Sequence, residues 1–350
     1  MKKIEQSDLY GKHLICTQDW TKHELDLVLD LAGRMKRERY AYSNVLEHKT
    51  FFMFFYNPSV RTRQSFEVAA TELGGHAQFL EPKSMRLKTE KTAGETVEDA
   101  AQVMSRYAHG LGIRILEDKV SEYGQGERLL REYAKWSSIP VISMAHDTFH
   151  PCQGLADVMG WSEWFHKGPQ YPPDWKTLND KKLLIAWGHG ALARSWCSVQ
   201  EAMLIGSRYG MDVTVANPEG YNLDPQVLKW TEENCNENEA QFETTNHLTK
   251  GYEGAHVVYS RNWMSSEAYQ NGELLKQQEI EKASKFPDWI CDSKKMSLTN
   301  NAIFTHPMPI DRGHEVSDDV ASGPRSCIYD VAENRLHAQK AIMALTMGGF

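Results

Sequence analysis

Short apolar runs alternate with amphipathic segments along most of the chain. Thr21 and Glu24 form a capping-box pattern, and apolar residues follow them at helical spacing, so a helix is predicted over 21–38. The run 50-TFFMFFY-56 is continuously apolar, which is typical of a strand buried on both faces. Apolar residues at positions 66, 69, 70 and 73 then predict a second helix, which the glycines at 74 and 75 end.

The alternation of strands and helices continues toward the C-terminus. Strands are predicted at 110–115, 139–144, 183–187, 212–216, 256–259 and 302–306, and helices at about 94–109, 126–136, 195–208 and 331–345. Such alternation indicates parallel sheets with crossover helices. We therefore expect an α/β protein with two doubly wound domains, at residues 1–150 and 151–330. A C-terminal helix at 331–350 is expected to return to the first domain.

Composition narrows the class of protein. The chain has 350 residues, about twice the usual domain length, and its 41% apolar and 25% charged residues are typical of a soluble globular protein. A net charge of -8 argues against a nucleic-acid partner. The chain lacks a membrane-length apolar run and a secretory signal pattern, so we expect a cytoplasmic protein without a membrane partner. Six scattered cysteines indicate reduced thiols rather than a metal site.

The turn 57-NPSVRTR-63 stands between the first buried strand and its helix. A helix N-terminus offers free backbone N–H groups and a partial positive charge, which favour a phosphate. Ser59 and Thr62 add hydroxyl groups, and Arg61 and Arg63 add charged donors. The turn is therefore a candidate anion site. The alternative is a solvated helix start in which the arginines pair with acidic residues further along the helix.

Other polar residues lie where open α/β sheets bind ligands, at the carboxyl ends of strands. Arg114 lies within the strand predicted at 110–115, and His150 and Gln153 follow the strand at 139–144. His306 closes the strand at 302–306 and begins the proline-rich segment 306-HPMP-309. Each residue alone is more readily explained as structural. Their coincidence at several strand ends favours a common site.

The motifs NPSVRTR, GIR, HPCQ and HPMP, in this order, resemble those of the aspartate/ornithine carbamoyltransferase superfamily. The resemblance covers nearly the whole chain. It is strongest to the N-acylornithine branch, which contains the N-acetylornithine and N-succinylornithine carbamoyltransferases. This branch is indicated by four segments, 17-TQDW-20, 218-PEGYNLDP-225, 296-MSLTNNAIF-304 and 332-AENRLHAQKAIMA-344.

The resemblance implies an enzyme of amino-acid metabolism, in arginine biosynthesis. It would transfer the carbamoyl group of carbamoyl phosphate to an amino-acid amine and release phosphate, without a metal or another cofactor. The family's assembly implies a homotrimer with active sites shared between subunits. A loop of the neighbouring subunit would complete each site, and its residues here would be Met85 and Arg86.

The resemblance also implies roles for individual residues. The phosphate-binding positions are Ser59, Val60, Arg61, Thr62 and Arg63. Donors around the carbamoyl oxygen, which would stabilise the charge that develops there, are Thr62, Arg114 and His150. The carbamoyl amino group would be held by Gln153 and by the carbonyl groups of Pro307 and Met308. Arg335 matches a further ligand-binding arginine.

The acceptor site departs from the family pattern. Ala145 stands where the N-acylornithine branch has a glutamate, and Arg261 replaces the lysine of its K-[SN]-W motif. In 306-HPMPIDR-312, Asp311 replaces one arginine of that branch. The acceptor-binding positions implied are Arg194, Arg261, Trp263 and Arg312. These arginines predict an acceptor with a carboxylate, for which ornithine or an N-acylornithine is the first candidate and an aspartate-like amine the next. The N-acylornithine branch has a knotted, proline-rich loop at this place. The segment 188-GHGALARSWCS-198 contains no proline, so we make no prediction about a knot.

Two other functions fit parts of the sequence. The segment 188-GHGALA-193 matches the G-x-G-x-x-A fingerprint of NAD-binding oxidoreductases, although the next strand ends in Ala216 and Asn217 rather than in an acidic residue. A non-catalytic paralogue that binds carbamoyl phosphate is the second alternative, and the retained anion-binding residues argue against it. The pair of histidines in 146-HDTFH-150 is weak support for a metal site, which the chemistry does not require.

Overall fold

The computed structural model describes residues 8–81, 93–166 and 174–348, and these form two compact units. Unit 1 comprises the chain up to Leu155 together with the residues from Asn334 onward, and unit 2 is Ala156–Glu333. The boundaries fall inside two helices, α5 (Pro151–Phe165) and α12 (Ile328–Met347). Both units contain a parallel sheet covered by helices, so the predicted α/β fold class is confirmed.

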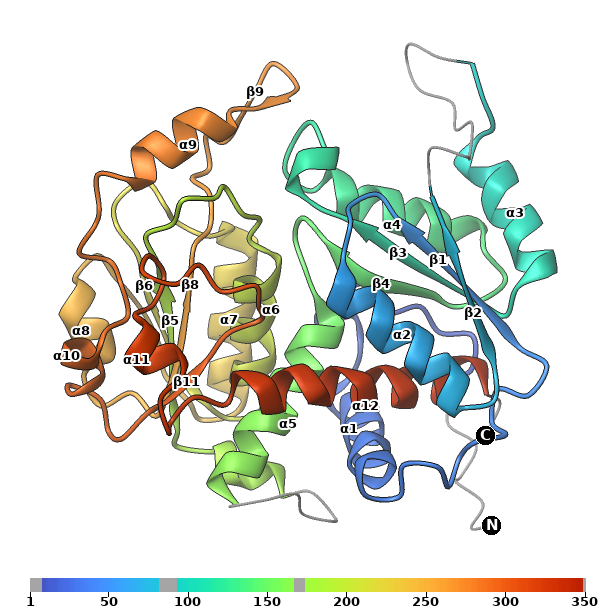
Figure 1. Ribbon diagram of the computed structural model, residues 1–350, viewed down its shortest axis with the longest axis horizontal. Coiled ribbons are helices and arrows are strands. Elements are labelled where there is room, and N and C mark those ends of the chain that lie inside the picture. The colour runs from blue at the N-terminus through green and yellow to red at the C-terminus, as the bar shows by residue number, and fades with distance from the viewer. Residues whose placement is uncertain (1–7, 82–92, 167–173, 349–350) are drawn as a thin grey trace. The chain divides into compact units, whose positions relative to one another are not determined.

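Unit 1 is built on a parallel sheet in the order β2-β1-β3-β4. The strands are β1 (Thr50–Phe55), β2 (His76–Leu80), β3 (Gly110–Ile115) and β4 (Val141–His146). The helices are α1 (Lys22–Arg37), α2 (Val60–Glu72), α3 (Val97–Tyr107) and α4 (Gln125–Trp136). The strand order reverses between β1 and β3, so the crossovers on the two sides of β1 lie on opposite faces. In Figure 1, α3 and α4 cover one face and α2 lies with the end of α12 on the other.

Local sequence signals explain where the first helices begin and end. Thr21 and Glu24 form the predicted capping box of α1, in which each side chain bonds the other residue's backbone. Ser59 caps α2 by accepting a hydrogen bond from the Thr62 N–H. Gly74 ends the segment at a φ of 81°, where a Cβ atom would approach the Ser43 carbonyl oxygen to 2.3 Å. Only glycine fits that turn.

A register shift distorts the sheet beside β3. Ile113 is opposite Ser143, but the next residue, Arg114, is opposite Ala145, so β4 carries one extra residue at this point. The strand starts two residues later than predicted, because Pro140 has no N–H to donate to a ladder, and it extends to His146. Bulges often reorient side chains next to active sites. This one lies at the strand position of Arg114.

Unit 2 contains a parallel sheet in the order β11-β8-β5-β6-β7. Its strands are β5 (Lys182–Trp187), β6 (Asp212–Ala216), β7 (Phe242–Thr245), β8 (Val257–Arg261) and β11 (Ile303–Thr305), beside a small hairpin of β9 (Tyr269–Gln270) and β10 (Glu273–Leu274). Its helices are α6 (Cys197–Arg208), α7 (Pro225–Glu237), α8 (Leu248–Tyr252), α9 (Lys276–Ala283), α10 (Ser293–Met296) and α11 (Asp318–Ala321). The strand order reverses between β5 and β8.

Several elements were absent from the sequence-based prediction. These are α5, α7, α8, α9, α10, α11, β2, β7 and the β9–β10 hairpin. Helix α5 is apolar around most of its surface and nearly all of its side chains are buried, so it lacks the one-sided stripe that indicates a helix. Its start carries a readable signal, since Pro151 stands at the first helical position. Strand β7 is mostly exposed and polar, which gives no strand pattern.

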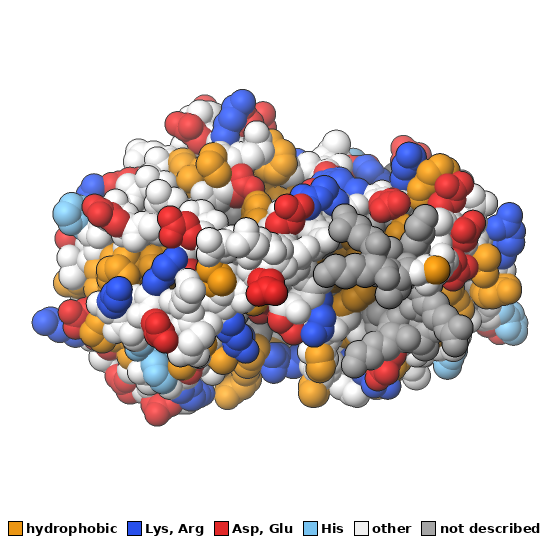
Figure 2. Space-filling model, turned by 90° about the horizontal axis from the view of Figure 1, so that it is seen from above, with side chains coloured by type: hydrophobic (Ala, Val, Ile, Leu, Met, Phe, Trp, Pro, Cys, Tyr) orange, Lys and Arg blue, Asp and Glu red, His pale blue; other side chains and the backbone are white. Residues whose placement is uncertain are grey.

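The surface and the cysteines complete the description. Figure 2 shows acidic and basic side chains interspersed over the visible described face. Within residues 8–81, 93–166 and 174–348, no helix combines the length and hydropathy that crossing a bilayer would need. All six cysteines belong to these residues, and each is a buried free thiol.

His337 of α12 should make the folding of the protein sensitive to mild acid. Burial, with the nearby Lys36, lowers the pKa of His337 to about 4, whereas an unfolded histidine has a pKa near 6.5. Between these values the unfolded chain binds a proton that the folded chain does not, so the free energy of unfolding falls as the pH falls. Replacement His337→Gln should reduce this slope by up to about 1.4 kcal/mol per pH unit. Urea unfolding from pH 7 to pH 4 measures the slope, and the exposed His48→Gln is the control.

Candidate active site

The turn between β1 and α2 presents the start of a helix at the carboxyl end of the sheet. Ser59 has an extended backbone, and its Oγ lies 3.3 Å from the Thr62 backbone nitrogen. The turn is fixed to the end of β3 by Asn57, whose Oδ1 accepts a hydrogen bond from the Leu116 N–H at 2.7 Å. The next side chains, Val60 and Arg61, are exposed. The turn before α2 is thus held in place by Asn57, while the first residues of the helix are exposed to solvent. An anion can therefore reach the backbone N–H groups of the helix start.

Two arginines from distant parts of the chain meet at one hydroxyl group of this turn. Arg335 of α12 donates a hydrogen bond from Nη2 to the Thr62 Oγ1 at 2.8 Å. Arg114 of β3 places Nη1 3.5 Å from the same oxygen. Thr62 is fully enclosed and Arg335 is largely buried. Two guanidinium groups and a helix N-terminus therefore concentrate positive potential around one buried hydroxyl, an arrangement that favours a bound anion.

His150 and Gln153 lie at the start of α5, directly after β4. Both side chains are buried. The Gln153 N–H donates to the His150 carbonyl at 2.9 Å, so the two residues form one turn of the helix start. Because β4 is paired with β3, their segment follows the strand next to the one that carries Arg114. Unit 1 thus assembles Thr62, Arg114, His150 and Gln153 at the carboxyl edge of one sheet.

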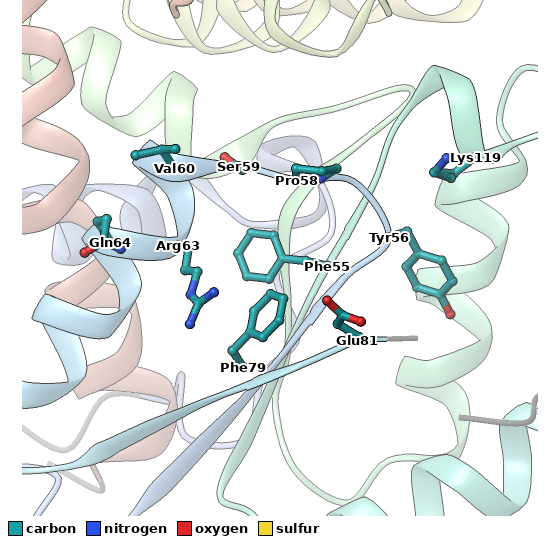
Figure 3. A pocket seen from close by; sticks show the side chains of 10 residues that line it. All are labelled: Phe55, Tyr56, Pro58, Ser59, Val60, Arg63, Gln64, Phe79, Glu81 and Lys119. Atoms are coloured by element: carbon teal, nitrogen blue, oxygen red, sulfur yellow. The ribbon is translucent and has the colours of Figure 1, made fainter. Parts of the chain in front are cut away.

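Arg63 is held away from this cluster. Its Nε lies 2.8 Å from the Glu67 carboxylate, and its guanidinium lies 4.0 Å from the centre of the Phe79 ring. Figure 3 shows the side chain directed toward Phe79 along the wall of a pocket of about 660 Å³. Of the two interpretations of the arginines, the pairing with an acidic residue of the same helix describes Arg63. The arginines that lie next to the Thr62 hydroxyl are Arg114 and Arg335, rather than Arg63.

A second cluster lies in unit 2, at the carboxyl ends of β5, β8 and β11. Arg261 ends β8 and is 7% exposed, and its Nε and Nη1 groups have no hydrogen-bond partner among the described residues. Arg194 lies on the segment after β5, with its Nε 3.9 Å from the Glu315 carboxylate. Glu315 in turn accepts a hydrogen bond from His306 Nε2 at 3.0 Å. Two arginines, one carboxylate and one histidine therefore form a mostly buried polar cluster.

His306 and Glu315 of this cluster differ in their protonation at neutral pH. Burial lowers the pKa of His306, which favours its neutral form. Burial alone would raise the pKa of Glu315, but His306 and the two arginines lower it to about 2. The Met308 N–H donates to His306 Nδ1 at 2.8 Å, so the neutral ring carries its proton on Nε2 and donates it to Glu315. At neutral pH the carboxylate is ionised and the imidazole is neutral.

The other residues predicted in this unit have different surroundings. Trp263 is fully buried, and its Nε1 donates to the Tyr221 carbonyl at 2.8 Å, which makes it a core residue. Arg312 pairs with Asp318 at 3.0 Å and with the Ser322 hydroxyl at 2.9 Å. Both partners bond Nη1 of Arg312, and neither belongs to the cluster of Arg194 and Arg261.

Pro307 and Met308 form the irregular backbone that was expected after β11. Pro307 is buried, and Met308 has a φ of 57° followed by a cis bond to Pro309. Met85 and Arg86, predicted as the contribution of a neighbouring subunit, lie outside the described residues. Glu315, three residues beyond the predicted motif 306-HPMPIDR-312, was missed as part of the site. Glu315 stands in an irregular segment without periodic spacing, so no pattern singles it out.

The glycines of 188-GHGALA-193 have a structural explanation. A Cβ atom on Gly188 would approach the Glu315 backbone to 3.0 Å, and one on Gly190 would approach the Asn262 side chain to 2.9 Å. The glycines therefore permit close packing of this loop against the residues after β8 and β11. The histidine–aspartate pair 146–147 is likewise structural, since the Asp147 carboxylate accepts a hydrogen bond from the Gly124 N–H at 2.7 Å. Among the described residues, no group of three His, Cys, Asp or Glu side chains could hold a metal ion.

Comparison with known families identifies the class of protein as a carbamoyltransferase. Residues 12–163 match the aspartate/ornithine carbamoyltransferase, carbamoyl-P binding domain, and residues 185–346 match the Asp/Orn binding domain of the same family. The chain belongs to the aspartate/ornithine carbamoyltransferase family, as the sequence motifs predicted. The interpretation as an NAD-binding oxidoreductase is therefore wrong.

Relatives along nearly the full length include two kinds of carbamoyltransferase. The ornithine carbamoyltransferase of Pyrococcus abyssi is 36% identical over 347 residues, which is 97% of both chains. The N-acetylornithine carbamoyltransferase of Xanthomonas campestris pv. campestris is 35% identical and covers 96% of this chain and 98% of its own. A crystal structure of acetylornithine transcarbamylase complexed with acetylcitrulline superposes with a TM-score of 0.86 at 33% identity, over 96% of this chain and 99% of that one.

Proposed function

We propose that the protein transfers the carbamoyl group of carbamoyl phosphate to the amine of an ornithine-type acceptor, either ornithine or an N-acylornithine. The acceptor nitrogen forms a bond to the carbamoyl carbon, the bond from that carbon to the phosphate oxygen breaks, and the amine proton leaves with the phosphate. The observation that carries the proposal is the convergence of Arg114 and Arg335 on the Thr62 hydroxyl at a helix N-terminus. The relatives, named as ornithine and N-acetylornithine carbamoyltransferases, support a role in the metabolism of amino acids related to arginine.

The residues of unit 1 fit the carbamoyl phosphate half of this reaction. The α2 N-terminus and the hydroxyl of Ser59 would bind the phosphate, with Val60 and Arg61 contributing at the tip. Arg114, His150 and Thr62 would surround the carbamoyl oxygen and stabilise the charge that develops on it. Gln153 is proposed to bind the carbamoyl amino group. The leaving phosphate can accept the amine proton, so the mechanism requires no further base.

The residues of unit 2 fit the recognition of an acceptor carboxylate. Arg261 is buried with two unpartnered donor groups, and a buried cation with free donors is a strong site for a carboxylate. Arg194 is proposed to share that carboxylate. Arg312 and Trp263 are proposed to flank the acceptor rather than to bind its carboxylate, because Arg312 Nη1 bonds Asp318 and Trp263 Nε1 bonds the Tyr221 carbonyl. An aspartate-like amine is the alternative acceptor.

Exchange of the Ser59 cap tests the phosphate site without loss of the helix. Asp and Asn are both good helix caps, and Asp is also favoured by the helix dipole, so both variants should keep the stability of α2. Ser59→Asp should abolish carbamoyl phosphate binding, because its charge repels the phosphate, whereas Ser59→Asn should weaken binding by about tenfold or less. Calorimetric titration measures the affinity and thermal unfolding measures stability. Equal binding by the two variants would place the phosphate elsewhere.

A panel of amines tests the acceptor. Formation of a ureido product would be measured with carbamoyl phosphate and ornithine, N-acetylornithine, N-succinylornithine or aspartate. One ornithine-type compound should dominate the ratio kcat/KM. Preference for aspartate would select the alternative, and absence of any product together with tight carbamoyl phosphate binding would indicate a non-catalytic binding protein.

We further propose a cytoplasmic homotrimer with shared sites. Support comes from the pocket beside the Ser59 turn, where Val60 is 77% exposed and the aromatic rings of Phe55 and Phe79 line the wall (Figure 3). Sedimentation measures the mass of the assembly. Mixing an Arg114→Gln variant with an Arg86→Ala variant tests sharing, because a trimer with shared sites should regain part of the activity. A monomer of full activity would refute this assembly.

A further inference from the structure

A single carboxylate holds together the three segments that carry the proposed acceptor residues. Glu315 is fully buried. One of its oxygens accepts a hydrogen bond from the Asn262 N–H at 2.8 Å and lies 3.9 Å from Arg194 Nε. The other oxygen accepts from the Asp311 N–H at 2.9 Å and from His306 Nε2 at 3.0 Å. The residues that follow β5, β8 and β11 are thus positioned by the same side chain.

A second tie reinforces the arrangement. Asp311 accepts a hydrogen bond from the Ala191 N–H at 2.9 Å, and its other oxygen lies 3.1 Å from His314 Nδ1. The loop after β5 is therefore joined directly to the segment after β11. Because Arg194 follows this loop closely, both carboxylates act on the position of its guanidinium. The side chain of Asp311 is 18% exposed, so its charge is partly screened by solvent, whereas that of Glu315 is not.

The charges of the buried cluster do not cancel. Arg194 and Arg261 are always protonated, His306 is neutral and Glu315 is ionised, so these four side chains carry one positive charge in excess. The carboxylate of Asp311 lies at the edge of the cluster and is partly exposed, so solvent screens its charge. The unpartnered donors of Arg261 show where part of that excess lies. One carboxylate of a ligand would neutralise the cluster. A second carboxylate would bring an unmatched negative charge beside the buried Glu315, which is costly away from water.

We propose that Glu315 is a specificity-determining residue. It selects acceptors that bring one carboxylate, rather than two, into the cluster of Arg194 and Arg261. The proposal rests on the proposed function, since it assumes that the cluster of Arg194 and Arg261 binds the acceptor. Glu315 acts in two ways. It positions Arg194 and the 306–311 backbone, and its charge opposes a second carboxylate. The aspartate-like alternative is thereby disfavoured.

Two unreactive ligands that differ in carboxylate number test the proposal. N-acetyl-L-norvaline carries one carboxylate and N-acetyl-L-aspartate carries two, and both have a blocked amine. Calorimetry would measure their dissociation constants with the full-length protein saturated with carbamoyl phosphate. The wild-type protein should bind the norvaline derivative at least tenfold more tightly. Glu315→Gln should reduce this ratio at least tenfold at saturating carbamoyl phosphate. The carbamoyl phosphate affinity of the variant is measured separately, because Glu315 also positions the backbone of Pro307 and Met308.

Glu315→Asp separates charge from geometry. It keeps the negative charge but shortens the side chain, so both ligands should bind more weakly while their ratio stays within threefold of the wild-type value. If Glu315→Gln does not fold, as thermal unfolding would reveal, the ratio for Glu315→Asp decides, and a lost preference overturns the proposal. An unchanged ratio in folded Glu315→Gln would reduce Glu315 to a structural residue. Wild-type protein that binds neither ligand would instead refute the ornithine-type acceptor itself.

Discussion

Replacement of Arg114 by glutamine should lower kcat by about 100- to 1000-fold. Arg114 lies at the register shift between β3 and β4, and its Nη1 lies 3.5 Å from the Thr62 hydroxyl, the centre of the candidate carbamoyl phosphate site. In the proposed reaction, negative charge develops on the carbamoyl oxygen. The loss of one well-placed donor to such an oxygen typically costs about 3–4 kcal/mol of transition-state stabilisation. Steady-state kinetics with saturating acceptor and carbamoyl phosphate would measure the effect.

Arg63→Gln provides the matched control, because it removes another arginine that the sequence predicted for the carbamoyl phosphate site. Arg63 is engaged with Glu67 and Phe79, so its loss should change kcat by less than about threefold and cost roughly 0.5–1 kcal/mol of stability. Similar losses of kcat in the two variants would show that Arg63 also acts in the reaction. Unchanged kcat in Arg114→Gln would remove Arg114 from the catalytic centre.

The arginines of the candidate carbamoyl phosphate site illustrate what the sequence could and could not predict. The anion-binding turn was predictable because a strand, a capping serine and a helix follow one another directly, and these are local features. The pairing of Arg63 with Glu67 was one of the two predicted alternatives, because residues four apart on a helix face one another. The contact of Arg63 with Phe79 depends on where the next strand lies in space, which no local pattern determines. The meeting of Arg335 with Thr62 spans more than 270 positions, and only the resemblance to a family indicated it.

The strands of the two sheets other than β2 and β7 were predicted because their apolar runs are buried on both faces. Helix α5 was missed for the same physical reason, since a helix that is buried all round loses the amphipathic period. In the acceptor cluster, the arginines were predicted from motif positions, but Glu315 was not. Its importance arises from four contacts made by one carboxylate, and two of those involve donors from other segments of unit 2, namely Asn262 and Arg194.

Replacement of Arg261 by glutamine should raise the acceptor KM by roughly 100-fold or more, with little change in carbamoyl phosphate affinity. The Arg261 guanidinium is buried, and its Nε and Nη1 have no partner among the described residues, so an acceptor carboxylate would be their first partner. Loss of one member of a buried, hydrogen-bonded charge pair typically costs about 2–5 kcal/mol. Arg194→Gln should act in the same direction, but less strongly, because Arg194 already lies 3.9 Å from Glu315.

Arg312→Gln is the control for this prediction. Its guanidinium is bonded to Asp318 and Ser322, and the side chain is 35% exposed, so the acceptor KM should change less than about threefold. Initial rates at saturating carbamoyl phosphate measure KM for each variant, and calorimetry measures carbamoyl phosphate binding separately. If neither Arg194 nor Arg261 affects the acceptor KM, the acceptor is not recognised by this cluster. A large effect of Arg312→Gln alone would place acceptor recognition at Arg312, on the exposed side of the segment after β11. The acceptor carboxylate would then compete with Asp318 for the Arg312 guanidinium.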